Sequence, residues 1–221
     1  MPGSVAICML ESPSVNVARP YSAVSPSLDG DVLVALSRTT HPLTGRRVAE
    51  LVAAGSPDGV RKTLDRLVEQ GVVRREPAGR ALMHTLNREH LAAPAVEALA
   101  TMRSDLLSRL RAAVSSWSLP AVHVSLFGSA ARGDGDTDSD IDIFVVRPDP
   151  IDPDDPRWRG QHERLAADVL TWTGNHAAMV ESSEGQLSQL ARSGAPILDA
   201  LRRDGISLGG TPLELASGVG Q

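Results

Sequence analysis

The order of apolar and polar residues changes at about residue 30 of this 221-residue chain. The first 29 residues hold four prolines and show no helical period, which predicts a loosely ordered arm over 1–29. Two segments that follow, DVLVALSRT and TGRRVAELVAAG, place apolar residues at helical spacing, and Thr44 is a candidate N-cap for the second. The pattern therefore predicts two helices directly after the arm.

A third helix and a hairpin are predicted next. In SPDGVRKTLDRLVEQG, Ser56 can cap the helix, Pro57 suits its first position and Gly71 ends it, with an apolar stripe between them. The run VVRREPAGRALMHTLN then consists of two strand-like segments around Pro77-Ala78-Gly79. These sixty residues are predicted to fold as three helices followed by a hairpin.

This order of elements, and above all the run LDRLVEQGVVRRE, resembles the winged helix-turn-helix of bacterial transcription regulators. The resemblance predicts a winged helix-turn-helix domain over 30–90, with its third helix in the major groove of duplex DNA and its hairpin against the backbone. The residues expected to face DNA are the basic ones of the third helix and the hairpin: Arg61, Lys62, Arg66, Arg74, Arg75 and Arg80. A solvated helix face and a protein-binding module are the alternative interpretations.

A long amphipathic segment separates the two halves of the chain. Residues 91–118 carry Val96, Leu99, Met102, Leu106 and Leu110 at near-helical spacing, which predicts a connecting helix. Because a single recognition helix contacts few bases, a DNA-binding homodimer is expected. The same apolar stripe would serve equally as the first helix of the next domain.

Aspartates alternate along the stretch GDGDTDSDIDIFVV in the second half. A calcium loop is excluded, because Ser139 stands where the turn needs glycine and Val145 where it needs a bidentate glutamate. Asp134, Asp136 and Asp138 are interpreted as a hydrated turn. Asp140 and Asp142 differ, because they alternate with isoleucines on a predicted strand, so both carboxylates face one side and repel unless a cation joins them.

A second chemical signal lies just upstream, in VHVSLFGSAARG. A short apolar strand runs into Gly128 and Ser129 at a helical start, which offers backbone N–H groups and a hydroxyl to a phosphate. GSAARG followed by SDIDI closely resembles the signature of the nucleotidyltransferase superfamily that includes DNA polymerase beta, especially its small stand-alone members. The resemblance predicts an α/β nucleotidyltransferase domain with a small mixed sheet over 119–221, and a two-domain α+β chain.

The resemblance also implies site roles. Gly128 and Ser129 would hold the phosphates of an NTP, expected to be ATP, and Asp140 and Asp142 would hold Mg²⁺ or Mn²⁺. Arg132 would either neutralise phosphate charge or form a structural ion pair. Active relatives carry a third carboxylate on a later strand, here NHAAMVES, where the expected position falls at His176, Ala177 or Ala178 and Glu181 is the acidic residue present. Glu181 is therefore the candidate third catalytic carboxylate, with a helix-capping role or a two-carboxylate site left open.

Composition narrows the setting. Asp31 to His90 holds ten Arg or Lys against seven Asp or Glu, whereas Ala121 to Gln221 holds eight against sixteen. Cys8 is the single cysteine, and no run of about 18 apolar residues occurs, so a cytoplasmic protein without a membrane anchor is expected. The expected function is transfer of an NMP from an NTP to a hydroxyl of a protein, RNA or small molecule. A nucleotide-sensing transcription regulator and a toxin-antitoxin or defence component remain alternatives.

Overall fold

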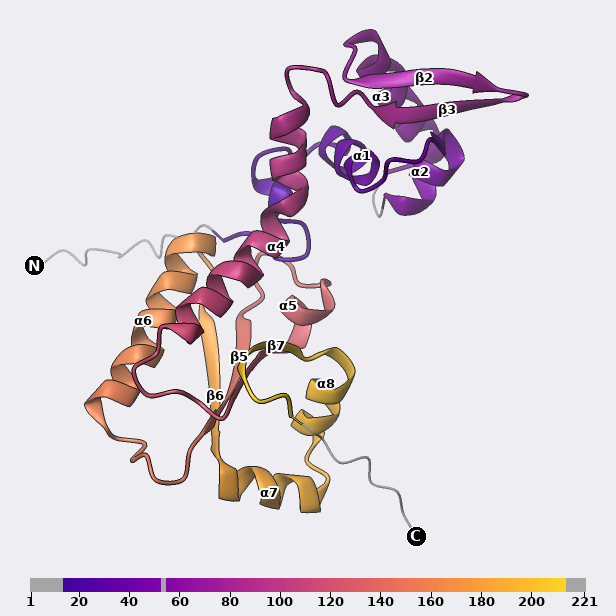
Figure 1. Cartoon of the computed structure of the whole chain (residues 1–221). Helices are drawn as coiled ribbons and strands as arrows, with labels where there is room; N and C mark the ends of the chain where they lie inside the picture. The colour runs from indigo at the N-terminus through magenta and orange to yellow at the C-terminus, as the bar shows by residue number, and fades with distance from the viewer. Residues whose placement is uncertain (1–13, 53–54, 214–221) are drawn as a thin grey trace, which may run out of the picture. The chain divides into compact units, whose positions relative to one another are not determined.

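The computed structural model describes residues 14–52 and 55–213 and divides the chain into two compact units (Figure 1). One unit comprises Arg19–Leu107, and the other combines Met1–Ala18 with Ser108–Gln221. The boundary falls inside one long helix, α4 (Ala93–Ser115). None of the helices in the described ranges is long and apolar enough to cross a membrane.

The unit of Arg19–Leu107 contains helices and a small antiparallel sheet in the order that the sequence predicts. Its elements are η1 (Pro20–Ala23), α1 (Leu28–Ser37), β1 (Leu43–Thr44), α2 (Gly45–Leu51), α3 (Pro57–Glu69), β2 (Val73–Ala78) and β3 (Ala81–Leu86), with strand order β1-β3-β2. Val32, Val48, Leu64, Leu67 and Leu86 are among the residues that form its core.

The start of α3 follows from its sequence. The Ser56 hydroxyl accepts a hydrogen bond from Gly59 N at 3.1 Å, and Pro57 occupies the first helical turn, where its missing N–H costs nothing. The predicted cap at Thr44 is present on α2 in the same way, with Arg47 N as its donor. The turn between β2 and β3 contains Gly79 at a positive φ of 61°.

The other unit is built on a four-stranded mixed sheet of order β6-β5-β4-β7. Its strands are β4 (His123–Leu126), β5 (Ile141–Arg147), β6 (Ala177–Ser183) and β7 (Ile206–Gly210), and its helices besides the end of α4 are α5 (Gly128–Arg132), α6 (Pro156–Thr173), α7 (Glu184–Ser193) and α8 (Pro196–Asp204). β5 pairs with β6 in parallel, while β4 pairs antiparallel with β5 and β7. The predicted small mixed sheet is thus present.

The two faces of this sheet have different coverings. Phe144 and Val146 point to one face and pack with Leu198 and Leu201 of α8. By strand alternation, Ile141, Ile143 and Val145 point to the opposite face, and all three are fully buried. Asp142 shares the face of Phe144, which places its carboxylate on the side covered by α5, α7 and α8.

The predicted loose arm over 1–29 corresponds in part to ordered structure. Val15 N donates to Thr173 O at 2.9 Å, and Val17 is buried in the same unit. In the other unit, the buried Tyr21 hydroxyl donates to Asp31 at 2.8 Å, and Arg19 pairs with the same carboxylate. Apolar and hydrogen-bonding partners that are distant in sequence hold residues 14–29, while residues 1–13 lie outside the described part.

Candidate active site

The candidate active site begins where β4 ends and the short helix α5 starts. Gly128 takes a positive φ of 68°, and a Cβ built there would overlap the Asp142 carboxylate oxygen Oδ2. Two independent features therefore require glycine at this position: the positive φ of the backbone and the close approach of Asp142. Phe127 N donates to Asp142 O at 3.0 Å and ties the end of β4 to β5.

Asp140 immediately precedes β5, and Asp142, the second residue of β5, lies next to the Gly128 backbone. Burial raises the pKa of Asp142, the nearby charge of Asp140 raises it further, and Arg132 lowers it. The two carboxylates thus interact electrostatically, as two like charges on one side of a strand should. Together they form a site at which a divalent cation would relieve the repulsion.

Asp134 and Asp136, in the same alternating stretch, form hydrogen bonds with neighbouring residues of the chain. The Ser139 hydroxyl donates to Asp136 Oδ1 at 2.7 Å, and this bond lowers the pKa of Asp136. Arg132 Nε donates to Asp134 at 3.0 Å. These contacts shape the turn that leads into Asp140, so the hydration expected for Asp134 and Asp136 is replaced in part by bonds within the loop.

Asn175 is a positioning residue that the sequence analysis missed. Its buried amide Nδ2 donates to Ser139 O at 3.0 Å, and its Oδ1 accepts from Val15 N at 3.1 Å. The carbonyl of the next residue, His176, accepts a hydrogen bond from Ile141 N at 2.8 Å. Asn175 therefore holds the chain on the N-terminal side of Asp140, although a lone Asn before a strand carries no motif.

Glu181 is not brought to the aspartate pair. Val145 and Glu181 are register partners in the parallel β5–β6 pairing, so Glu181 shares the sheet face of Arg147, opposite to that of Asp142. Arg147 Nε donates to its Oε1 at 2.7 Å, and Trp158 Nε1 donates to its Oε2 at 2.9 Å. Strand alternation thus separates the Glu181 side chain from the aspartate pair, and Glu181 is an ion-pair partner of Arg147.

Ala178 is the register partner of Asp142 on β6. A third carboxylate on the face of the aspartate pair would come from this position or from a neighbour of the same parity, and the side chains there are Ala178, Val180 and Ser182. Within residues 14–52 and 55–213, no group of three or more His, Cys, Asp or Glu side chains could hold a metal ion.

Two carboxylates nevertheless fit Mg²⁺. This ion prefers oxygen ligands, keeps several waters, and is commonly held by one or two carboxylates together with substrate phosphates. Asp140 and Asp142 supply such oxygens, and the Asp142 carboxylate lies directly against the Gly128 backbone.

Arg132 contacts acidic groups of its own unit. Besides Asp134, its guanidinium lies 3.6 Å from Asp204 at the end of α8, and the hydrogen bond to Asp134 raises the pKa of Arg132. Ser129, on the first turn of α5, is partly exposed. Arg132 is therefore held by acidic groups of its own unit, as the structural ion-pair interpretation predicts.

The six residues predicted to contact DNA lie in the other unit, and five of them form ion pairs there. On α3, Arg61 and Lys62 pair with Asp58, and Arg66 pairs with Asp29. In β2, Arg74 pairs with Glu89 and Arg75 with Asp65 at 2.7 Å. Arg80 is exposed in the turn between β2 and β3.

Comparison with known proteins identifies the unit that holds the aspartate pair. Residues 107–182 match the family model of the nucleotidyltransferase domain, a segment that includes β4, α5, β5 and α6. The chain thus carries a nucleotidyltransferase domain, and the prediction of a nucleotidyltransferase is confirmed. A search of curated proteins found no match.

Solved structures with similarity to the chain include a toxin-antitoxin with AMP-PNP, at 21% identity and a TM-score of 0.34 over 49% of this chain and 77% of that one. A mutant of the toxin-antitoxin MntA-HpeT is 20% identical, with a TM-score of 0.34 over 48% and 74% of the two chains. A putative nucleotidyltransferase from Sulfolobus solfataricus is 18% identical, with a TM-score of 0.27 over 48% and 81%. The domain assignment rests on the family model.

Replacing Gly128 by Ala should weaken Mg²⁺-dependent nucleotide binding beyond what its effect on folding stability explains. The left-handed conformation costs about 1–2 kcal/mol for a residue with a Cβ, and the new methyl group would also push the Asp142 carboxylate away. Gly194→Ala is the matched control, because Gly194 has a φ of 64° and no atom lies within 4 Å of the position that a Cβ would take there. Urea unfolding should show a similar loss in both variants, whereas Mg²⁺-dependent nucleotide binding should fall only in Gly128→Ala. Equal binding by the two variants would contradict the proposed geometry.

Asp142→Asn should change how stability depends on pH. Because the pKa of Asp142 is higher in the folded than in the unfolded state, its contribution favours folding at low pH and is lost as pH rises through the interval between the two pKa values. Above that interval the charged carboxylate destabilises the metal-free protein, so the variant should be more stable than the wild type at pH 7. The difference should shrink below the unfolded pKa of about 3.9. Thermal unfolding of both proteins from pH 3 to pH 8 in EDTA measures this difference in stability. A wild type that is more stable than Asp142→Asn at pH 7 would contradict a raised pKa of Asp142.

Proposed function

We propose that the unit containing Asp140 and Asp142 transfers a nucleoside monophosphate from an NTP to a hydroxyl group of a protein, an RNA or a small molecule. The observation that carries the proposal is the packing of the Gly128 backbone against the Asp142 carboxylate, with Asp140 beside it. This contact supports a binding region in which the Gly128 backbone would meet the phosphates and the two carboxylates would hold a divalent cation. ATP is the expected NTP.

The reaction would form a bond between the acceptor oxygen and the α-phosphorus and break the bond from that phosphorus to the bridging oxygen of pyrophosphate. Bound Mg²⁺ would neutralise phosphate charge and favour deprotonation of the attacking hydroxyl. Asp140 and Asp142 would hold the ion, Gly128 would let the phosphates approach the backbone, and the Ser129 hydroxyl would donate to a phosphate oxygen. Arg132 would exchange Asp134 for a phosphate oxygen.

Nucleotide sensing is the second candidate for this site, and a specific observation favours it. The side chain opposite Asp142 on β6 is that of Ala178, so a third carboxylate does not complete the pair there. A site with two carboxylates can bind Mg²⁺ and NTP whether or not it supplies a base for the acceptor hydroxyl. The toxin-antitoxin or defence role remains a form of the transfer hypothesis in which the acceptor is a partner macromolecule.

Turnover should depend on the aspartates and not on Glu181. With each γ-³²P-labelled NTP and Mg²⁺ or Mn²⁺, release of labelled pyrophosphate should fall by more than about a hundredfold in Asp140→Ala and Asp142→Ala, equivalent to about 2.7 kcal/mol of transition-state stabilisation. Glu181→Gln keeps an acceptor for Trp158 and should retain activity, because its side chain lies on the other face. Full activity in either aspartate variant would reject the site. Mg²⁺-dependent NTP binding without turnover in the wild type would support sensing instead.

We also infer that the unit of Arg19–Leu107 is a winged helix-turn-helix that binds duplex DNA. The two faces of α3 support this inference. Val60, Leu64 and Leu67 are buried on one face, whereas Arg61, Lys62 and Arg66 are exposed. Exposed ion pairs contribute only about 0–1 kcal/mol, so DNA phosphates can replace Asp58 and Asp29 as partners. A homodimer that presents two such helices stays a prediction.

DNA binding by the full chain should weaken steeply with salt, because each bound phosphate releases counterions. Arg80→Ala should reduce the slope of log K against log[salt] by about 0.9 if Arg80 contacts a phosphate. Arg192→Ala, on α7 of the other unit, is the charge-matched control and should leave the slope unchanged. Fluorescence anisotropy between about 50 and 200 mM salt gives both values. Salt-independent or undetectable binding would assign the unit to another role.

A further inference from the structure

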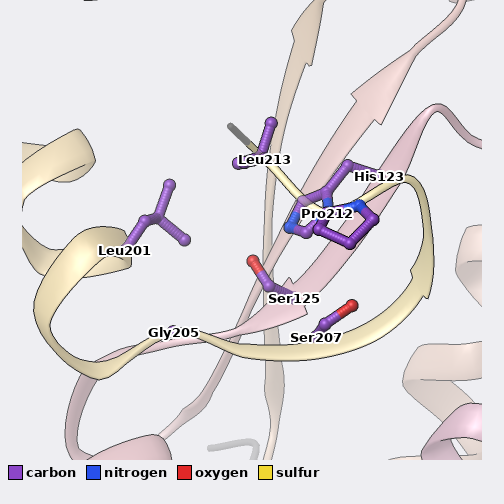
Figure 2. A pocket seen from close by; sticks show the side chains of 7 residues that line it. All are labelled: His123, Ser125, Leu201, Gly205, Ser207, Pro212 and Leu213. Carbon is purple, nitrogen blue, oxygen red and sulfur yellow. The ribbon is translucent and has the colours of Figure 1, made fainter. Parts of the chain in front are cut away.

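A small cavity lies in the nucleotidyltransferase unit, over β4 and β7 and beside the end of α8 (Figure 2). It encloses about 160 Å³. Its lining includes the polar side chains of His123, Ser125 and Ser207 and the apolar side chains of Leu201, Pro212 and Leu213. The roles proposed for the aspartate pair use none of these side chains.

Ser125 gives the cavity an unsatisfied hydrogen-bonding group. The residue is only 2% exposed, and its Oγ has no hydrogen-bond partner among the described residues. Figure 2 shows this hydroxyl directed into the space between Leu201 and His123. Because leaving a buried hydroxyl unpaired is costly, an unpaired Oγ that faces a cavity is available to pair with a water molecule or with a polar group of a ligand.

His123 presents a second polar group of defined character. Its Nδ1 lies 2.9 Å from Thr211 O, and since a carbonyl only accepts, Nδ1 carries the proton. Burial lowers the pKa of His123, which favours the neutral ring, and in the neutral ring with Nδ1 protonated Nε2 is an acceptor. The lining therefore combines a hydroxyl that can donate or accept with an imidazole nitrogen that accepts.

The charge of the cavity restricts what it can bind. Its described lining residues include no Asp, Glu, Lys or Arg. A phosphate, carboxylate or ammonium group would lose its hydration there without gaining an opposite charge. The volume is also below the roughly 300–1,000 Å³ typical of pockets for drug-sized ligands, which suits a single ring system.

The cavity is also close to the aspartate pair along the sheet. Ser125 is the register partner of Phe144, which shares the face of Asp142. Gly205, another lining residue, follows Asp204, whose carboxylate lies 3.6 Å from the Arg132 guanidinium. Gly128 follows Ser125 by three positions, or about 10 Å of extended chain, a span within the length of a nucleoside triphosphate.

We propose that this cavity binds a neutral nucleobase, with Ser125 and His123 as its hydrogen-bonding partners and Leu201, Pro212 and Leu213 against the ring. The base has two sources with the same chemistry: a free nucleoside, or the NTP of the proposed transfer reaction. The second source rests on the proposed function, and the first does not.

The test uses the full chain and the four nucleosides adenosine, guanosine, cytidine and uridine, titrated by calorimetry in EDTA. At least one nucleoside should bind without metal, and Ser125→Ala should weaken it about tenfold, as the loss of one hydrogen bond predicts. Ser182→Ala removes another buried serine of the same sheet, outside the cavity, and should leave binding unchanged. Thermal unfolding without nucleoside controls for folding, and Ser125→Ala should be no less stable than Ser182→Ala, because it removes an unpaired hydroxyl.

A second arm separates the sources and keeps this test independent of turnover. Asp142→Ala should bind the nucleoside as the wild type does, even if no NTP is turned over. If Ser125→Ala weakens Mg²⁺–NTP binding by the same factor as nucleoside binding, the cavity holds the base of the NTP; if NTP binding is unchanged, it holds a separate nucleoside. Absence of binding by all four nucleosides, or equal weakening in Ser125→Ala and Ser182→Ala, would overturn the proposal.

Discussion

The close approach of the Asp142 carboxylate to the backbone of Gly128 is the constraint on which the site depends. It requires a residue without a Cβ at the end of β4, a positive φ at the start of α5, and a short antiparallel pairing that aligns β4 with β5. The same contact partly buries Asp142 next to Asp140, which raises the pKa of Asp142 and stores repulsion that a divalent cation would remove. Local backbone geometry and metal chemistry are thus linked through one pair of residues.

Strand alternation divides the chemistry of the sheet between its faces. Asp142 lies on the face that α5, α7 and α8 cover, whereas Glu181 lies on the opposite face with Arg147 and Trp158. His162 of α6, at 3.7 Å from Glu181, completes this second cluster, and burial lowers the pKa of its ring. Glu181, although acidic and on the strand next to β5, therefore helps to pack α6 on β6. The register partner of Asp142 on β6 is Ala178, whose side chain is only a methyl group.

The sequence predicts more of the fold than of the site. Caps at Thr44 and Ser56 and the hairpin appear where periodicity and turn residues place them, because those signals are local. The small mixed sheet was expected only from the family resemblance. The juxtaposition of Gly128 with Asp140 and Asp142 was also predictable, since their spacing forms a motif. The side of the sheet to which Glu181 points depends on the β5–β6 register, and the anchoring of the Asp140 loop depends on Asn175 and Val15, which are 160 residues apart. Neither relation is encoded in a local pattern.

We propose that two carboxylates, those of Asp140 and Asp142, hold the metal ion and nucleotide of this domain without Glu181. A crystal structure of the full chain with Mg²⁺ and a non-hydrolysable NTP analogue tests it most directly. The account predicts oxygens of Asp140 and Asp142 at about 2.0–2.1 Å from Mg²⁺, with phosphate and water oxygens as the remaining ligands and Glu181 still paired with Arg147. A metal ion bound elsewhere, or Glu181 moved to the coordination sphere, would contradict it.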